Sequence, residues 1–214
     1  MYLALPKLFL SDLVELHLWN ILVTGYISPE TMITYLSTLT KLRYLFIGFH
    51  SPSSRPDQRD TDRPPPTCTV LLTLTQFCFH GVSEYLEDFV SRIDAPHLSF
   101  ATITFFNQLL FDIPQLPRLI GRTKKLKSPN RATVVFNSDD VVITLYSLRR
   151  KKKGHEILTL RISPRESDRQ VSSLAQMCSL SSPLLSHVER IDIHEGDSSQ
   201  PGWHWDDDMD HAQW

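Results

Sequence analysis

The stretch LVELHL, residues 13–18, has apolar side chains at its first, fourth and sixth positions. The same pattern returns as LRYLFI at 42–47 and as LTQFCF at 74–79. A weaker copy begins at Leu98, and a late copy, VERIDI, occupies residues 188–193. A pattern that recurs at roughly 30 residues is typical of a repeat array, in which each unit buries its apolar side against the next unit.

Three further runs have the composition of β-strands. They are ATVVF at 132–136, DVVITLY at 140–146 and ILTLRI at 157–162. They fill the long gap before VERIDI, which has room for three units of roughly 30 residues, so the sequence predicts about seven strand units. The apolar residues that share one phase of the pattern should lie in one continuous core. These are Leu16, Leu18, Leu45, Ile47, Phe77, Phe79, Ile191 and Ile193.

Helical signals lie between the strands. Ser28-Pro29-Glu30 combines a capping residue, a proline for the first helical position and an acid for the first turn, and this helix should end near Leu39. Ser83 is expected to cap SEYLEDFVSRI, whose apolar residues recur at helical spacing. Residues 114–122 have a similar spacing, as does the segment from Asp168 with Val171, Leu174 and Cys178.

The alternation of strands and helices predicts an α/β fold over residues 1–214. We expect a leucine-rich-repeat-like solenoid of irregular strand–helix repeats, with a parallel sheet on its concave face. A doubly wound sheet is the alternative for such alternation. It is disfavoured because none of the seven glycines forms a phosphate-binding loop of the G-x-G-x-x-G or G-x-x-x-x-G-K type.

Segment 51–67, SPSSRPDQRDTDRPPPT, interrupts the array between the second and third strands. It has five prolines and no aliphatic or aromatic side chain, so we interpret it as a disordered, proline-rich insertion. We also expect both ends of the region to be truncated. No polar capping unit comes before LVELHL, and the chain stops at Trp214, just after a cluster of aspartates that is typical of a helix start.

The composition favours a soluble intracellular protein without a strong global charge. The chain has 214 residues and a formal net charge of −2, so no overall field attracts nucleic acid or an anionic membrane. Its three cysteines form no C-x-x-C pair, which favours a reducing compartment, the cytoplasm or the nucleus. No apolar run approaches the length of about 18 residues that a membrane span needs.

The motifs that carry catalysis or bind metals are missing from the sequence. There is no G-x-S-x-G nucleophile turn and no H-E-x-x-H zinc motif, although the chain has nine histidines. Asp207 and His211 could meet on one helix face, but an acidic helix start explains them as well. We therefore expect no enzyme activity, no metal and no cofactor.

One run of positive charge stands out in the sequence. It consists of Arg149, Arg150, Lys151, Lys152 and Lys153, and Gly154 follows it. A nuclear-import signal or a nucleic-acid patch is one interpretation, and a solvated loop between two strands is the other. Nucleic-acid binding is not our leading hypothesis, because no aromatic residue lies within the run.

The residues between the core positions should form a binding surface. Alternate residues of a strand point to opposite sides of a sheet, so these residues face away from the core. We expect a protein partner to contact this row, with Trp19, Tyr44 and Phe46 as an aromatic cluster at one end. The candidate residues are Glu15, His17, Trp19, Tyr44, Phe46, Gln76, His80, Thr102, Arg161, Arg190 and Asp192.

Long phrases of the sequence resemble the repeat region of F-box-like proteins of mushroom-forming fungi. They are LVELHLWNILVTGYISPETMITYLSTLTKLRYLFIGFHSP at 13–52, GVSEYLEDFVSRIDAPHLSFATITFFNQLLFDIPQLPRLIGRT at 81–123, and SSLAQMCS at 172–179. The asparagine that usually follows the leucine core of a repeat is displaced or absent here. Ile21, His50 and Val82 stand near its place.

The resemblance implies repeats that select the substrate of a cullin-type ubiquitin ligase. The family's F-box module, which binds the ligase adaptor, is not expected within these residues, so we do not expect adaptor binding. The leading hypothesis is thus a substrate-recognition surface whose partner is a ubiquitination substrate. The alternatives are a general repeat scaffold unrelated to ubiquitin, and a nucleic-acid binder that uses residues 149–153.

Overall fold

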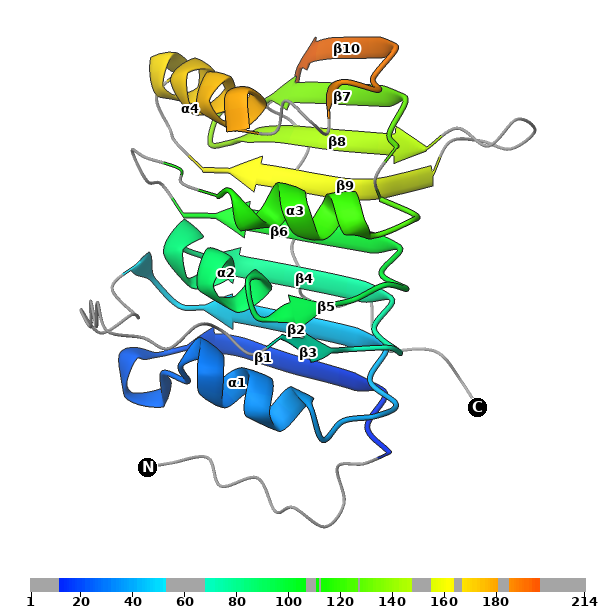
Figure 1. Ribbon diagram of the computed structural model, residues 1–214. Coiled ribbons are helices and arrows are strands. Elements are labelled where there is room, and N and C mark those ends of the chain that lie inside the picture. The colour runs from blue at the N-terminus through cyan, green and yellow to red at the C-terminus, as the bar shows by residue number, and fades with distance from the viewer. Residues whose placement is uncertain are drawn as a thin grey trace, which may run out of the picture.

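The repeated strand pattern builds one open sheet in the computed structural model (Figure 1). The structure describes residues 12–52, 68–106, 111, 113–126, 128–147, 155–163, 167–180 and 185–196. Over these residues the sheet has eight strands. Their order in space is β1 (Glu15–Ile21), β2 (Tyr44–Phe49), β4 (Gln76–Gly81), β6 (Phe100–Phe105), β9 (His155–Ile162), β8 (Val141–Ser147), β7 (Arg131–Phe136) and β10 (Arg190–Glu195).

The sheet is mostly parallel, and β8 is the exception. Strands β1, β2, β4, β6 and β9 pair in parallel, as do β7 and β10, whereas β8 runs antiparallel to both of its neighbours. The expectation of a parallel sheet therefore holds for most of the strands and is wrong at β8. The reason is the short link between β7 and β8, where the Asn137 N–H donates to the Asp140 carbonyl at 2.8 Å. A parallel connection needs a dozen or more residues, whereas antiparallel strands can follow each other through a tight turn.

The three runs between residues 131 and 162 consequently form an antiparallel meander and not three successive repeat units. The meander returns toward the first strands, so β9 lies next to β6 while β7 lies three places away. The chain then crosses back to place β10 beside β7.

Four helices of the described residues lie on one face of the sheet (Figure 1). They are α1 (Pro29–Leu36), α2 (Ser83–Val90), α3 (Gln115–Arg122) and α4 (Ser167–Leu180). A short 3₁₀ turn, η1 (Val23–Gly25), precedes α1, and a small parallel pair joins β3 (Thr69–Val70) to β5 (Ile93–Asp94). Among these helices none is both long and apolar enough to cross a membrane.

The helix starts agree with the sequence in one case and differ in another. Ser28 caps α1, because its hydroxyl oxygen accepts a hydrogen bond from the Thr31 N–H at 3.3 Å. That helix ends at Leu36, one turn before the expected end. Ser83 is not the cap of α2, since it is already the first helical residue and Val82 occupies the capping position.

Three successive strand starts repeat the same backbone hydrogen bonds. The Val14 carbonyl accepts the N–H groups of Arg43 and Tyr44 at 2.7 and 3.1 Å. The Arg43 carbonyl accepts those of the next unit, from Thr75 and Gln76, at 2.9 and 3.0 Å. The carbonyl of Thr75 does the same for the unit that starts β6. The first four strands of the sheet are therefore joined at their starts by one recurring pattern of backbone hydrogen bonds.

The core lies between the sheet and the helices. Leu45, Ile47, Phe77 and Phe79 are each at most 1% exposed and belong to one buried cluster, which confirms their expected burial. Leu16 and Leu18 occupy the same phase on β1 but are only half-buried. Fewer side chains pack against them, because β1 is the outermost described strand on that side of the sheet.

The expected burial of Ile191 and Ile193 is wrong. These side chains are 58% and 67% exposed, since β10 is the outermost strand at the other end and its helix-side face has little cover among the described residues. Val171 of α4 is also exposed, at 56%. The buried side of that helix carries Gln170 and Met177 instead, and the Gln170 amide donates to the Asn137 carbonyl at 3.0 Å.

Candidate interaction surface

The face of the sheet opposite the helices carries the residues that the sequence assigned to partner binding. We call it the open face, because no described helix covers it (Figure 1). The strand pairing lines these residues up in rows across the strands. One row contains Glu15, Tyr44 and Gln76, the next contains His17, Phe46, Cys78 and Thr102, and a third contains Gly48, His80, Thr104 and Arg161.

The structure therefore brings most of the predicted residues together and separates two of them. Arg190 and Asp192 lie on β10, which β8 and β7 separate from Arg161 on β9. The expected row is thus continuous from β1 to β9, and its last part lies at the far end of the sheet.

Four rings form two adjacent stacks at the β1 end of the open face. We call His17, Trp19, Tyr44 and Phe46 the aromatic cluster. The rings of Trp19 and Phe46 stack with centroids 3.8 Å apart, and those of His17 and Tyr44 stack at 4.7 Å. The two stacks lie side by side, since the His17 and Trp19 centroids are 6.4 Å apart and their planes differ by only 14°.

The two members of the Trp19–Phe46 stack differ in their exposure. The Trp19 side chain is 47% exposed, whereas Phe46 is only 5% exposed. Phe46 lies between the indole ring and the sheet surface at Gly48, so it supports Trp19 and offers little contact area of its own. Trp19 is therefore the ring that a partner can contact.

An irregularity in β1 accompanies the exposed position of Trp19. The pairing of β1 with β2 shifts between Leu18 and Ile21, and Asn20 adopts a left-handed backbone conformation with φ of 50°. Asparagine tolerates this conformation better than most residues. The bulge leaves both Trp19 and Asn20 exposed at the end of the strand.

Two polar groups of the open face, Tyr44 and Cys78, are held in their neutral forms. The Tyr44 hydroxyl donates a hydrogen bond to the Cys78 sulfur at 3.5 Å. Burial raises the pKa of both groups, and the contact with Cys78 adds to the shift of Tyr44. A raised pKa keeps Cys78 as a thiol, and the thiol is not the reactive nucleophilic form.

The His80 ring is also held in its neutral form, which for an imidazole means that burial lowers its pKa. Burial, and secondly the charge of Arg161, lowers the pKa of the His80 ring, so the ring is neutral at pH 7. It lies 4.6 Å from the Phe106 ring, which covers one side of it.

Arginines dominate the other end of the open face. Arg131 and Arg190 both donate to Asp192, at 2.8 and 2.9 Å, and Arg131 also lies 5.7 Å from the centroid of the Tyr146 ring. These hydrogen bonds, that of Arg190 first, lower the pKa of the Asp192 carboxyl. Nearby, Arg161 on β9 forms an ion pair at 3.1 Å with Asp140, which lies in the link between β7 and β8.

Sequence reasoning missed Arg131, Tyr146 and Asp140. Arg131 and Tyr146 share the phase of the open face on β7 and β8, so strand alternation could have found them. Their position beside Asp192 depends on the meander, which the repeat pattern does not predict.

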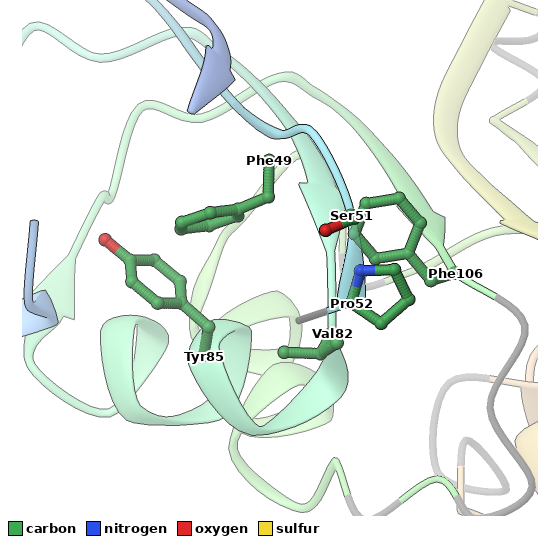
Figure 2. A pocket seen from close by; sticks show the side chains of 6 residues that line it. All are labelled: Phe49, Ser51, Pro52, Val82, Tyr85 and Phe106. Atoms are coloured by element: carbon green, nitrogen blue, oxygen red, sulfur yellow. The ribbon is translucent and has the colours of Figure 1, made fainter. Parts of the chain in front are cut away.

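A shallow hollow lies at the carboxyl ends of three parallel strands (Figure 2). Its volume is about 170 Å³ including open solvent, and it has no enclosed space for a water molecule. The lining is mostly apolar: Phe49, Ser51, Pro52, Val82, Tyr85 and Phe106. Ligand sites in open α/β sheets often lie at this edge, but this hollow has no charged side chain and too little depth to enclose a substrate.

Three sequence features fall outside the described residues. They are the basic run Arg149–Lys153, the tail with Asp207 and His211, and most of the insertion, residues 53–67. Within the described residues, no group of three or more histidine, cysteine or acidic side chains is arranged to hold a metal ion.

Comparisons with protein-family models, with curated proteins and with solved structures find no match to this chain.

Proposed function

We propose that this chain is a non-catalytic protein-interaction module whose binding surface is the open face of the sheet. The observation that carries the proposal is the aromatic cluster, in which Trp19 is 47% exposed although Phe46 supports it from below. Tryptophan and tyrosine are among the residues that most often dominate the energy of a protein interface.

We further propose that the module is of the leucine-rich-repeat type and acts as the substrate-recognition part of an F-box-like ubiquitin-ligase receptor in the cytoplasm or nucleus. The hydrogen-bond pattern that recurs at Val14, Arg43 and Thr75 supports a repeat origin, as do four strands stacked in register with helices on one side. The link to ubiquitin rests on the resemblance of the sequence alone, and it needs its own test.

Proximity labelling with the full chain and with Trp19→Ala identifies the partner. We expect at least one protein to be labelled by the natural chain, to bind it directly when both are purified, and to be lost with Trp19→Ala. Val171→Ala is the matched control, because Val171 is similarly exposed, at 56%, but lies on α4, on the helix side. Equal loss with both variants would contradict an open-face site.

The ubiquitin link is tested on the partner so identified. If the chain selects substrates, removing it from cells should lengthen the lifetime of the partner, and blocking the proteasome should have the same effect. A partner whose lifetime does not change would leave a general repeat scaffold as the better description.

A further inference from the structure

We infer that two copies of this chain associate through the outer edge of β10, which pairs antiparallel with itself around a two-fold axis at Ile193. The inference concerns the end of the sheet opposite the aromatic cluster and does not rest on the proposed function. Three observations carry it: the regular edge of β10, its two exposed isoleucines, and the pairs of residues that a two-fold axis brings together.

The outer edge of β10 is regular enough to accept another strand. β10 ends the sheet in Figure 1, and within the described residues its one neighbour is β7. Edge strands of natural proteins are often kept apart by a proline or a bulge. β10 contains no proline, and its pairing with β7 runs without a shift from Arg190 to Glu195. The strand at the other end, β1, does have a bulge.

The helix-side face of β10 has an apolar surface that a second strand would cover. Ile191 and Ile193 are 58% and 67% exposed, although their register partners on β7, Ala132 and Val134, are buried. Large aliphatic side chains on the outermost strand of a sheet favour contact with another apolar strand. A second copy of β10 offers the same two isoleucines.

The backbone hydrogen bonds show which groups of β10 point outward. The N–H groups of Arg190 and Gly196 donate to carbonyls of the β7 side, at 3.3 and 2.7 Å. Backbone groups of successive residues in a strand point to opposite edges, so the even-numbered residues between them also point toward β7. The outward N–H and carbonyl groups are therefore those of Ile191, Ile193 and Glu195.

These outward groups determine how two copies of β10 can pair. In an antiparallel pair the outward groups of one strand bond to those of the other, and opposite residues lie on the same face. Outward residues of one copy thus lie opposite outward residues of the other. The isoleucines of both copies come together on the helix side, and the two open faces lie on one side of a continuous sheet.

One register is favoured over its two neighbours. A two-fold axis at Asp192 would place two carboxylates opposite each other, which is destabilising. An axis at Ile191 would need the N–H of Glu189, and this group already donates to the Asn130 carbonyl at 2.9 Å. An axis at Ile193 avoids both problems.

The register centred on Ile193 also gives complementary pairs. It pairs Ile193 with its own copy and Ile191 with Glu195 of the second copy, so every outward residue of β10 has a partner. On the open face it places Asp192 opposite His194 of the second copy, twice over. An imidazole N–H can donate to a carboxylate, so these polar side chains match as well.

Sedimentation of the full chain over a range of concentrations tests the association. A single pair of strands is a small interface, so we expect a dimer in the micromolar range and a monomer in dilute solution. Ile193→Thr keeps a β-branched side chain but removes apolar surface, and it should weaken the dimer at least tenfold. Leu72→Thr is the control, because Leu72 is 62% exposed but lies in the turn before β4. A natural chain that stays monomeric at millimolar concentration, or equal effects of the two variants, would overturn the inference.

Disulfide formation tests the register. Cys68→Ser and Cys178→Ser remove the two thiols that are not buried. In this background Ile193→Cys places two thiols across the axis with Cα atoms about 5.5 Å apart, a distance that a disulfide spans. Ile191→Cys places them about 14 Å apart, because they are four residues out of register. We expect Ile193→Cys to form a covalent dimer at least tenfold faster. Equal or faster cross-linking of Ile191→Cys, or none in either variant, would contradict an axis at Ile193.

Discussion

The ring of Phe46 occupies the space that a side chain at Gly48 would need. A Cβ built on Gly48 would lie 2.5 Å from Cε1 of Phe46, closer than real atoms approach. Because Phe46 lies flat at this point, Trp19 can stack on it at 3.8 Å and remain 47% exposed. The absence of a side chain at residue 48 therefore supports the exposed ring that we propose as the centre of the binding surface.

Gly48→Ala should displace the Phe46 ring and disturb the stack. We expect a loss of about 1–3 kcal/mol in the free energy of unfolding, the usual cost of forcing an extra group into a packed site. Equilibrium unfolding in denaturant measures it. Gly25→Ala is the control, because nothing lies within 4 Å of the Cβ it would add. If both variants are equally stable, Phe46 does not pack as described.

Leu45→Ala and Ile193→Ala should differ strongly, although both residues have the same phase in the repeat pattern. Leu45 has no exposed surface, so its truncation should cost about 2–5 kcal/mol. Ile193 is 67% exposed, and its truncation should cost less than about 1 kcal/mol. The same unfolding measurement compares them. A large loss for Ile193→Ala would indicate that β10 is covered in the folded protein.

The insertion should be dispensable for folding. Replacing residues 53–67 with a short Gly/Ser linker keeps Ser51 and Pro52, which line the hollow beside Phe49. The removed residues have no aliphatic or aromatic side chain to bury, and the entropy of closing a loop changes slowly with its length. We expect an unchanged melting temperature within a few degrees, and a drop of ten degrees or more would show that the segment packs.

His80 should make the protein less stable as the pH falls. Its pKa in the folded state is lowered by burial and by Arg161, whereas in the unfolded state it has the ordinary value of about 6.5. Near that value the unfolded chain binds more protons than the folded chain, so stability falls as the pH drops below about 6.5. His80→Gln should lose less stability than the natural chain between pH 7.5 and 5.5. Parallel pH curves for the two proteins would argue against a buried, neutral ring.

The sequence predicts the first half of the fold well, because there the repeat pattern and the chain order agree. The copies at 13–18, 42–47 and 74–79 form neighbouring strands, and their intervening residues share the open face. Strand alternation predicts that Glu15, His17, Tyr44 and Phe46 share one face, and the structure adds the register, with Glu15 beside Tyr44 and His17 beside Phe46.

The second half differs because a local turn overrides the repeat. Asn137-Ser138-Asp139-Asp140 is a run of turn-forming residues, and it folds β7 and β8 into a hairpin. These turn residues are visible in the sequence, but the spacing of the repeat copies predicts three successive units in their place. Apolar spacing does not distinguish a covered strand from an outermost one, so it predicts burial for Ile191 and Ile193, which the structure exposes.

The affinity of Trp19→Ala for a purified natural partner tests the open-face account most directly. The account predicts a loss of about 2 kcal/mol or more in binding free energy, with Val171→Ala unchanged. It also predicts that the Trp19→Ala variant stays folded, because Trp19 is 47% exposed and one ring stack contributes only about 0.5–1.5 kcal/mol beyond the area it buries. Full affinity of a folded Trp19→Ala variant for its partner would contradict the central claim.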